Sequence, residues 1–356
     1  MNWPFLTITL IKIVCVIVPV LTMVAYAVLA ERKISAWIQN RVGPNRTAPP
    51  LALKIPGLGR LLQSWGLFQP VADGLKFLLK EDFTPDYVRK AYFWLAPAIT
   101  MIPAFLVLAV IPFGSRLGNE QMVIADLNVG ILYTFGIVSL GVYGIVLAGY
   151  ASNSKYPFLG GIRSSAQMIS YEIAMGMSVV PLFLIVGDLN LSQVILWQAN
   201  HGWLILYSPI SFLIFLIAAF AETNRLPFDL PESETELVGG YHTEYSSLKF
   251  GMFFMGEYAN MIASSAMMVT LFLGGWSMPG FDAASSFWSR HLLAVGLCHI
   301  GIFLVKMLGF MLVFIWVRWM FPRFRYDQLM DLGWRRFIPL ALVNILATAA
   351  VLWIRQ

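Results

Sequence analysis

Eight apolar runs, each long enough to cross a lipid bilayer, constrain the fold of this chain more than any other feature. A bilayer core of about 30 Å takes about 20 helical residues. The alternation that a membrane β-barrel needs is absent, and open sheets cannot lie in lipid because their edge groups would be unpaired. We therefore predict an all-α integral membrane protein, with residues 1–356 in a single domain. Its eight transmembrane helices are expected at about residues 6–30, 91–113, 129–150, 165–187, 203–221, 249–275, 292–319 and 336–354.

The distribution of basic residues predicts the orientation of these helices. Of the 24 Lys and Arg residues, 19 fall in alternate connections, at residues 31–90, 151–163, 225–249 and 318–336. Basic loops remain on the cytoplasmic side of a membrane. The connections after the first, third, fifth and seventh runs are therefore expected in the cytoplasm, which places the N-terminus on the outer (periplasmic) side.

The first cytoplasmic connection contains an amphipathic segment at about residues 57–68. Apolar side chains recur there at helical spacing, while Arg60, Gln63 and Ser64 occupy other faces. This pattern predicts an interfacial helix in the membrane surface. The alternative is a soluble loop helix packed on its neighbour. The apolar residues are Leu58, Leu61, Leu62, Trp65 and Phe68.

Composition excludes several classes of function. The two cysteines, Cys15 and Cys298, both lie in apolar runs, so one chain cannot supply a cysteine-ligated cluster, and no disulfide framework is expected. We expect neither metal nor flavin in this chain, and any redox chemistry must belong to a partner or a diffusible carrier. The net charge of +5 reflects membrane orientation, so no nucleic acid partner is expected.

Ionisable residues inside predicted helices indicate an ion or proton path. Glu172 lies about seven residues into its predicted run, Glu257 is similarly deep, and Lys306 falls near the middle of another run. A charge at the bilayer centre costs from about 3 to more than 10 kcal/mol, so such residues usually face protein or water. The alternative is a buried Glu–Lys pair that fixes helix register. Lys12 lies near a helix end, where it can snorkel.

Six of the 19 acidic residues lie between Glu222 and Glu244. Helical spacing would allow Glu222 to pair with Arg225 if the helix continues, and Ser233 with Glu236 could form a capping box. Closely spaced carboxylates can also share protons, because each ionised neighbour raises the pKa of the next. The segment therefore predicts a relay for protons or a sensor of nearby charge.

Six sequence segments together resemble a known family. In their order and spacing they are similar to the membrane subunits of respiratory complex I that include the H subunit of NADH-quinone oxidoreductase and mitochondrial NADH dehydrogenase subunit 1. The resemblance covers nearly the whole chain. Two departures are a longer connection at Thr47 to Gly66 and the bulky pair Trp319 and Met320. The segments are "ERKISAWIQNRVGPNR", "LFQPVADGLKFLLKED", "AQMISYE", "AETNRLPFDLPESETELVGGYHTEYSSLKF", "GEYANM" and "PRFRYDQLMDLGW".

The resemblance implies an eight-helix subunit that forms much of a quinone chamber and couples quinone reduction to proton translocation through buried carboxylates. The substrate would be ubiquinone or menaquinone. FMN and iron–sulfur clusters would belong to partner subunits. The implied relay residues are Glu172, Glu222, Asp229, Glu232, Glu234, Glu236, Glu244, Glu257 and Lys306. The implied residues of the quinone chamber and its surroundings are Arg32, Gln39, Arg41, Asp73, Lys76, Arg163, Arg225, Phe228 and Arg318.

Partners and location follow from the same resemblance. The implied partners are the peripheral-arm subunits that carry the terminal iron–sulfur cluster and the quinone headgroup site, small membrane subunits leading to antiporter-like subunits, and membrane lipid. The expected location is the bacterial cytoplasmic (inner) membrane, as a multi-pass protein. The alternatives are the equivalent subunit of a membrane-bound hydrogenase or of a ferredoxin-linked photosynthetic complex, a secondary transporter, for which no repeat of helices is visible, and a scaffold, which leaves the intramembrane carboxylates unexplained.

Overall fold

The structure, a computed structural model, describes residues 3–48, 58–117, 120–231, 233–278 and 292–355, and it is built almost entirely from helices. The long helices are α1 (Trp3–Ile38), α5 (Lys90–Val107), α6 (Gly130–Ala151), α7 (Lys155–Val186), α10 (Pro209–Glu222), α12 (Ser247–Phe272), α13 (Leu292–Met320) and α15 (Ile338–Arg355). The short elements are α3 (Leu58–Trp65), α4 (Gln69–Leu79), α8 (Leu191–His201), α9 (Leu204–Tyr207), α11 (Glu234–Leu237), α14 (Tyr326–Asp331), the 3₁₀ turn η1 (Gly240–His242), the π-helical turn η3 (Leu332–Phe337) and the antiparallel pair β1 (Arg116–Leu117) and β2 (Glu120–Gln121).

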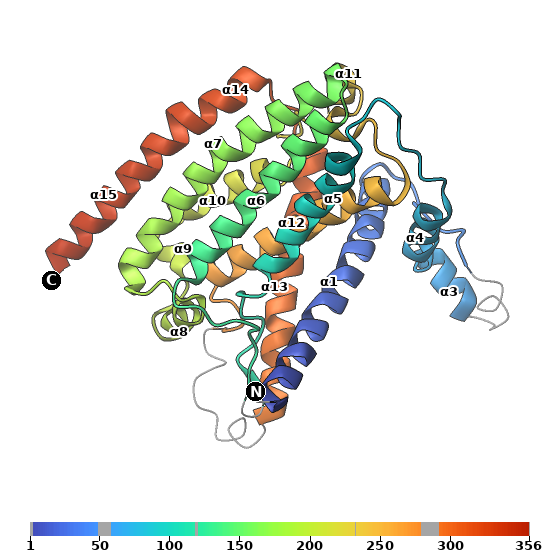
Figure 1. Cartoon of the computed structure of the whole chain (residues 1–356). Helices are drawn as coiled ribbons and strands as arrows, with labels where there is room; N and C mark the ends of the chain where they lie inside the picture. Colours follow the sequence, from blue (N-terminus) through green and yellow to red (C-terminus); the bar gives the residue numbers. More distant parts are fainter. Residues whose placement is uncertain (1–2, 49–57, 118–119, 232, 279–291, 356) are drawn as a thin grey trace.

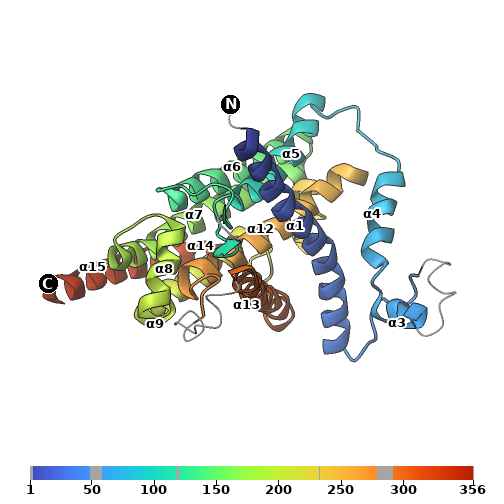
Figure 2. The same cartoon turned by 90° about the horizontal axis from the view of Figure 1, so that it is seen from below.

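The long helices form a bundle around one apolar core (Figure 1). α5 packs on α6, α6 on α7, α7 on α10, and α12 closes the bundle against α5. Fully buried side chains at its centre include Phe215, Met261 and Phe272. α1 lies along one side of the bundle and α15 along the other, packed on α7, while α3 and α4 stand beside the end of α1 (Figures 1 and 2).

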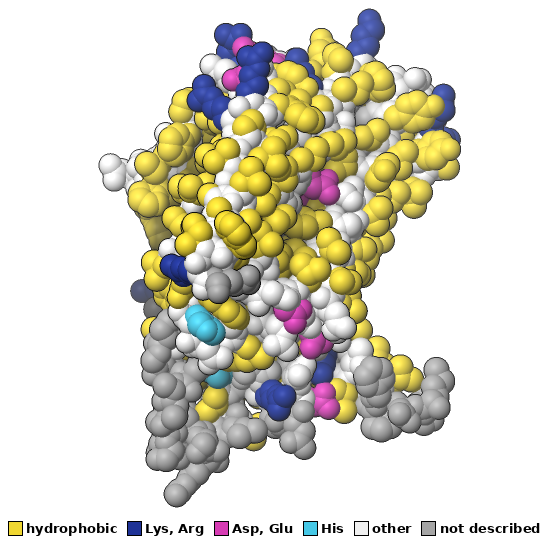
Figure 3. Space-filling model, turned by 90° about the vertical axis from the view of Figure 1, so that its left-hand side faces the viewer, with side chains coloured by type: hydrophobic (Ala, Val, Ile, Leu, Met, Phe, Trp, Pro, Cys, Tyr) yellow, Lys and Arg dark blue, Asp and Glu magenta, His cyan; other side chains and the backbone are white. Residues whose placement is uncertain are grey.

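Six of the described helices are long and apolar enough to cross a membrane, as the sequence predicts for an all-α membrane protein. Figure 3 shows a broad hydrophobic band on one face, with Lys and Arg gathered beyond one end of it. The predicted runs at 203–221 and 249–275 correspond to α9 with α10, and to α12. α10 has only 14 residues because it begins at Pro209, directly after α9. Proline fits the first turn of a helix but lacks the N–H group that would continue the preceding helix.

Two helices extend well beyond the predicted runs. α1 continues past Glu31 to Ile38, and α7 begins at Lys155, ten residues before its predicted start. The charges at the end of the first run do not stop α1 because they find partners within the protein. The Lys33 ammonium, for example, donates to the carbonyl oxygens of Val42 at 3.2 Å and Ser64 at 2.9 Å.

The predicted amphipathic helix is shorter than expected. α3 ends at Trp65 because Gly66 adopts φ +68°, a left-handed conformation that favours glycine. A second helix, α4, follows, and it was not predicted. Its apolar side chains Val71, Leu75 and Leu78 are each more than half exposed and share one helical face.

We expect close packing of α5 and α6 to make Gly144 intolerant of substitution. A Cβ atom at Gly144 would lie 2.6 Å from the Thr100 amide nitrogen and 3.0 Å from the Ala96 carbonyl oxygen, so Gly144→Ala must push the helices apart. Overpacking of this kind costs about 1–3 kcal/mol. The amount of chain in membranes should therefore fall, measured by quantitative immunoblotting. Gly136→Ala on the same helix is the control, since its Cβ would meet nothing within 4 Å. Equal amounts of the two variants would contradict this packing argument.

Candidate functional site

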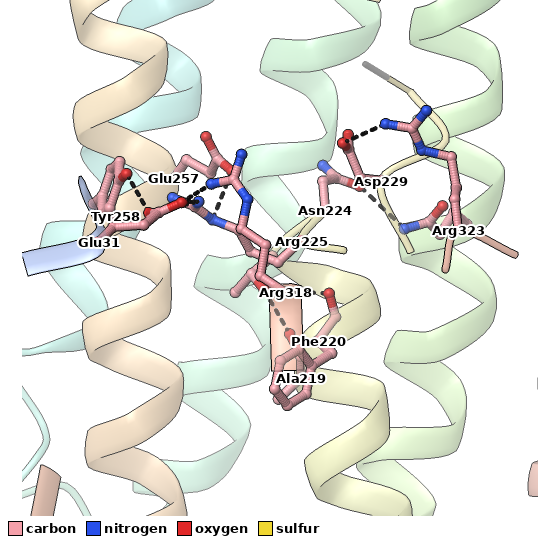
Figure 4. A network of polar contacts seen from close by, with 12 residues as sticks. Glu31, Ala219, Phe220, Asn224, Arg225, Asp229, Glu257, Tyr258, Arg318 and Arg323 are labelled. Atoms are coloured by element: carbon pink, nitrogen blue, oxygen red, sulfur yellow. Dashed lines mark hydrogen bonds and ion pairs between the residues drawn. The ribbon is translucent and has the colours of Figure 1, made fainter. Parts of the chain in front are cut away.

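A buried polar network lies where α1, α12, α13 and the segment after α10 meet (Figure 4). We call it the Glu31 network. Each element supplies one or two side chains, so the site forms only when helices distant in sequence pack together. Its members are Glu31, Arg225, Glu257, Tyr258 and Arg318.

The Glu31 carboxylate is the centre of this network. Its Oε2 accepts hydrogen bonds from Tyr258 Oη at 2.6 Å and from Arg225 Nη1 at 3.1 Å, and its Oε1 forms an ion pair with Arg318 Nη1. Arg225 also extends to Glu257, with Nε 2.9 Å from Oε1. The Arg225 guanidinium lies over the Tyr258 ring, 4.3 Å from its centroid. Glu31 thus joins two arginines from separate elements.

These charges are largely removed from water. Glu31 is 7% exposed and Arg225 is 6% exposed. Two glutamates and two arginines make the network formally neutral when all four groups are ionised. Charges in a poorly hydrated site interact more strongly than charges in water, so a change of one charge here acts strongly on the others.

Contacts from α7 and from Phe324, between α13 and α14, hold the segment that carries Arg225. Gln167 Nε2 donates to the carbonyl oxygens of Ala221 at 2.7 Å and Phe228 at 2.8 Å. The buried Phe228 ring packs against Tyr171, at 5.6 Å between ring centroids, and against Phe324, at 5.3 Å. Phe228, predicted at the quinone chamber, is therefore part of the packing that positions this segment.

Glu222, at the end of α10, lines two small pockets between the helices. Each has a volume of about 20 Å³, which is enough for one water molecule. One pocket also contacts Glu257, and the other is bordered by Thr134 and Ser264. Asn260 on α12 lines both. Glu222 therefore has room for a water molecule on two sides. One of these pockets lies toward Glu257 and the Glu31 network, and the other lies toward Thr134 and Ser264.

Glu172 also lies near Glu222, because α7 packs against α10 and the two carboxylates interact electrostatically. The sequence predicts Glu172 about seven residues into its helix. Since α7 begins at Lys155, Glu172 instead lies in the middle of a 32-residue helix.

The remaining described acids of the 222–244 segment pair with residues from separate elements, and Asp229 also interacts electrostatically with Glu257. Asp229 Oδ2 is 3.0 Å from Arg323 Nη2, and Glu236 Oε2 is 2.6 Å from Arg163 Nη1. Glu244 accepts a hydrogen bond from Tyr87 Oη at 2.6 Å, which raises the pKa of the Tyr87 phenol, with burial and the Glu244 charge adding to the effect. Glu232 and the side chain of Glu234 lie outside the described residues.

A histidine within the same segment is kept uncharged. Burial lowers the pKa of His242 to about 4, so the imidazole is neutral at physiological pH. It therefore adds no positive charge to this acidic region.

Five predicted quinone-passage residues lie on or near the end of α1 and on α4, at the cytoplasmic end predicted from the basic loops. Arg32 Nη1 is 2.7 Å from Asp73 Oδ2, whose other oxygen accepts from Gln69 at 2.9 Å. Arg32, Asp73 and Lys76 line a pocket of about 330 Å³. Gln39 and Arg41, just beyond α1, are hydrogen-bonded to each other.

Lys306 is positioned by backbone carbonyl groups at the opposite end of the bundle. Its ammonium donates to the carbonyl oxygens of Leu273 at 2.7 Å, Gly275 at 3.1 Å and Ser277 at 2.6 Å. It also lies 5.3 Å from the centroid of the Trp203 ring. These contacts compensate its charge where the end of α12 leaves carbonyl groups without helical partners.

Two local pairings that the sequence left open do not form. α10 ends at Glu222, so the helical spacing to Arg225 is lost and Arg225 pairs with Glu31 and Glu257 instead. Ser233 precedes α11 but makes no side-chain cap, because its hydroxyl accepts from Arg323 Nη1 at 3.0 Å.

Sequence reasoning also missed two residues of the site. Glu31 was interpreted as the end of a helix, and Asn260 lies unremarked inside the quoted "GEYANM" segment. Glu31 is the first residue of the segment "ERKISAWIQNRVGPNR", and its place in that segment was the signal that could have identified it as a site residue. Among the residues that the structure describes, no group of three or more His, Cys, Asp or Glu side chains is arranged to bind a metal.

Comparison with known proteins identifies the family. A family model described as NADH dehydrogenase matches residues 11–349. An NADH-quinone oxidoreductase H subunit of Geobacter metallireducens is 48% identical over 355 residues, covering 98% of each chain. The corresponding H subunit of Cytophaga hutchinsonii is 46% identical over 334 residues, covering 93% of this chain and 92% of the relative. That of Flavobacterium psychrophilum is 46% identical over 349 residues, covering 96% of each. With its membrane helices and buried charges, the chain therefore belongs to the NADH dehydrogenase family, the family of the NADH-quinone oxidoreductase H subunits.

Proposed function

We propose that this chain is the quinone-chamber and coupling subunit of a proton-pumping NADH:quinone oxidoreductase, respiratory complex I. It forms one membrane domain of eight transmembrane helices in the bacterial cytoplasmic membrane, with its N-terminus outside. The orientation rests on the basic connections. In addition to the six helices that are long and apolar enough to cross a membrane, the two remaining spans are the fifth, formed by α9 with the short apolar helix α10, and the sixth, formed by α12.

One observation supports this function above all others. The Glu31 network continues through Glu257 and a pocket of about 20 Å³ to Glu222. Ionisable residues in membrane helices that face protein or water are typical of proton paths. Polar groups thus extend from the Glu31 network through Glu257 to Glu222, and a change of charge at the network can act along them into the bundle.

The pocket around Asp73 is the proposed approach for the quinone headgroup. Reduction of a quinone to a quinol takes two electrons and two protons, and partner subunits supply the electrons. Arg32 forms an ion pair with Asp73, while Lys76 adds a positive charge to the same pocket. Charge that develops on the reduced quinone would be balanced by these cations until protons arrive.

Coupling then follows from electrostatics. At rest, Arg225 and Arg318 both pair with the Glu31 carboxylate. A negative charge near the chamber attracts the same arginines and weakens their hold on Glu31 and Glu257. A proton can then transfer to Glu257 and onward by way of the pocket to Glu222. Small membrane subunits would receive this change and pass it to antiporter-like subunits.

The test is to isolate the assembly through a tag on this chain and to reconstitute it in liposomes. We expect flavin and iron–sulfur partner subunits, NADH-dependent quinone reduction and proton uptake. Glu257→Gln should lower turnover and proton transport at least tenfold, because glutamine cannot take up a proton. Asp327→Asn, which alters an exposed pair with Arg325, is the control. The proposal would be contradicted if the chain were isolated with hydrogenase or ferredoxin-linked partners, or alone. Full activity of the Glu257→Gln variant would also contradict it.

A further inference from the structure

A second site lies at the end of the molecule where α1 and α13 begin, far from the Glu31 network (Figure 1). An apolar pocket of about 310 Å³ runs between α1, α12, α13 and the residues around β1. Its lining includes Cys15 and Val16 on α1, Ala266 on α12, and Phe303 and Met307 on α13.

A polar pocket of about 370 Å³ adjoins it. Lys12 lines both pockets, so they meet at its side chain. The polar pocket also contains Arg116, Glu120 and Asp126. Two cations and two carboxylates thus surround the entrance to an apolar slot.

Contacts organise these charges. The Lys12 ammonium lies 2.9 Å from Glu120 Oε2, which ties the β1–β2 hairpin to α1. Asp126 Oδ1 accepts hydrogen bonds from Asn190 Nδ2 at 2.9 Å and Ser192 Oγ at 3.1 Å. Arg116, in β1, has an exposed side chain. The carboxylates are therefore held in place, while the Arg116 guanidinium faces solvent beside them.

We propose that these joined pockets bind a phospholipid with an ammonium-bearing headgroup, phosphatidylethanolamine. An acyl chain fills the apolar slot, the phosphate pairs with Arg116, and the ammonium binds between Glu120 and Asp126. The balanced charges match a zwitterion rather than an anionic headgroup. An acyl chain suits the slot, because lipid tails are as apolar as the lining.

The test uses the assembled complex in nanodiscs that contain phosphatidylethanolamine with a diazirine in its acyl chain. After illumination and trypsin digestion, mass spectrometry measures adducts on the peptide from Ile13 to Arg32. Adducts at Val16 and Val20, which line the slot and are less exposed than Cys15, should exceed those of a matched phosphatidylglycerol probe at least fivefold. Adducts at Val14 and Val18, which are 57% and 56% exposed, report ordinary surrounding lipid and should not depend on the headgroup.

Two variants separate the site from general lipid contact. Arg116→Gln should remove the headgroup preference at Val16 and Val20, and Val16→Phe should reduce adducts at Val20 by filling the slot. Val14→Phe, on an exposed face of the same helix, should not. Any of three results would overturn the proposal. These are equal labelling by the two lipids, equal labelling in the Val16→Phe and Val14→Phe variants, and displacement of the lipid probe by added quinone. Because the readout is lipid labelling, its failure would leave the coupling role untouched.

Discussion

Replacing Glu31 by glutamine is expected to lower NADH-dependent quinone reduction at least tenfold. The substitution removes the one carboxylate that pairs with both Arg225 and Arg318. Leaving buried charges without their partner costs about 3–5 kcal/mol, so the arginines must move toward Glu257 or draw in water. Either response changes the charge distribution that the proposed coupling requires. The measurement is turnover per assembled complex, with the amount of complex determined on native gels.

Two further variants distinguish function from folding. Tyr258→Phe keeps the aromatic ring and removes only the hydroxyl group, which donates to Glu31 at 2.6 Å. The complex should therefore assemble normally, while turnover falls severalfold. Asp327→Asn alters an exposed ion pair, which is worth at most about 1 kcal/mol, and should leave turnover unchanged. Wild-type turnover and proton transport in Glu31→Gln would refute the role of the network.

The general class of fold could be predicted because bilayer thickness fixes helix length. Six of the eight predicted runs correspond to helices that are long and apolar enough to cross a membrane, with ends shifted by up to eight residues or, at the start of α7, by ten. Helix ends were harder to predict because they depend on contacts. Pro209 explains the start of α10 locally, but the extension of α1 depends on partners that Lys33 and Glu31 meet only in the folded chain.

The site was predicted less completely, for a related reason. Arg225 and Glu257 were identified as functional residues, yet the sequence suggested Glu222 as the partner of Arg225. The true partner, Glu31, lies 194 positions away, and local spacing carries no information about such a pair. Likewise, six acids close together in sequence suggested one array, but Asp229, Glu236 and Glu244 each bind a different residue from another element.

Replacing Asn260 by leucine is expected to reduce proton transport and quinone reduction together, at least tenfold. Asn260 lines both of the small pockets beside Glu222, and a buried water needs two to four polar partners. Leucine removes one such partner from each pocket and places methyl groups there. Without a hydrated position between Glu257 and Glu222, a proton has no route, and the two linked reactions stop. The measurement is NADH oxidation and dye-reported acidification in the same proteoliposomes.

Asn344 offers a matched control, because it is a buried asparagine away from these pockets. It donates to Ser211 Oγ at 2.9 Å and joins α15 to α10. Asn344→Leu should lower the amount of complex, since it leaves buried polar groups without a partner, but each assembled complex should retain its turnover. Asn260→Asp, which keeps a polar side chain in both pockets, should retain most of the activity. If Asn260→Leu also kept wild-type turnover per complex, protons would have to reach the membrane arm without these pockets, and the proposed route through Glu222 would be wrong.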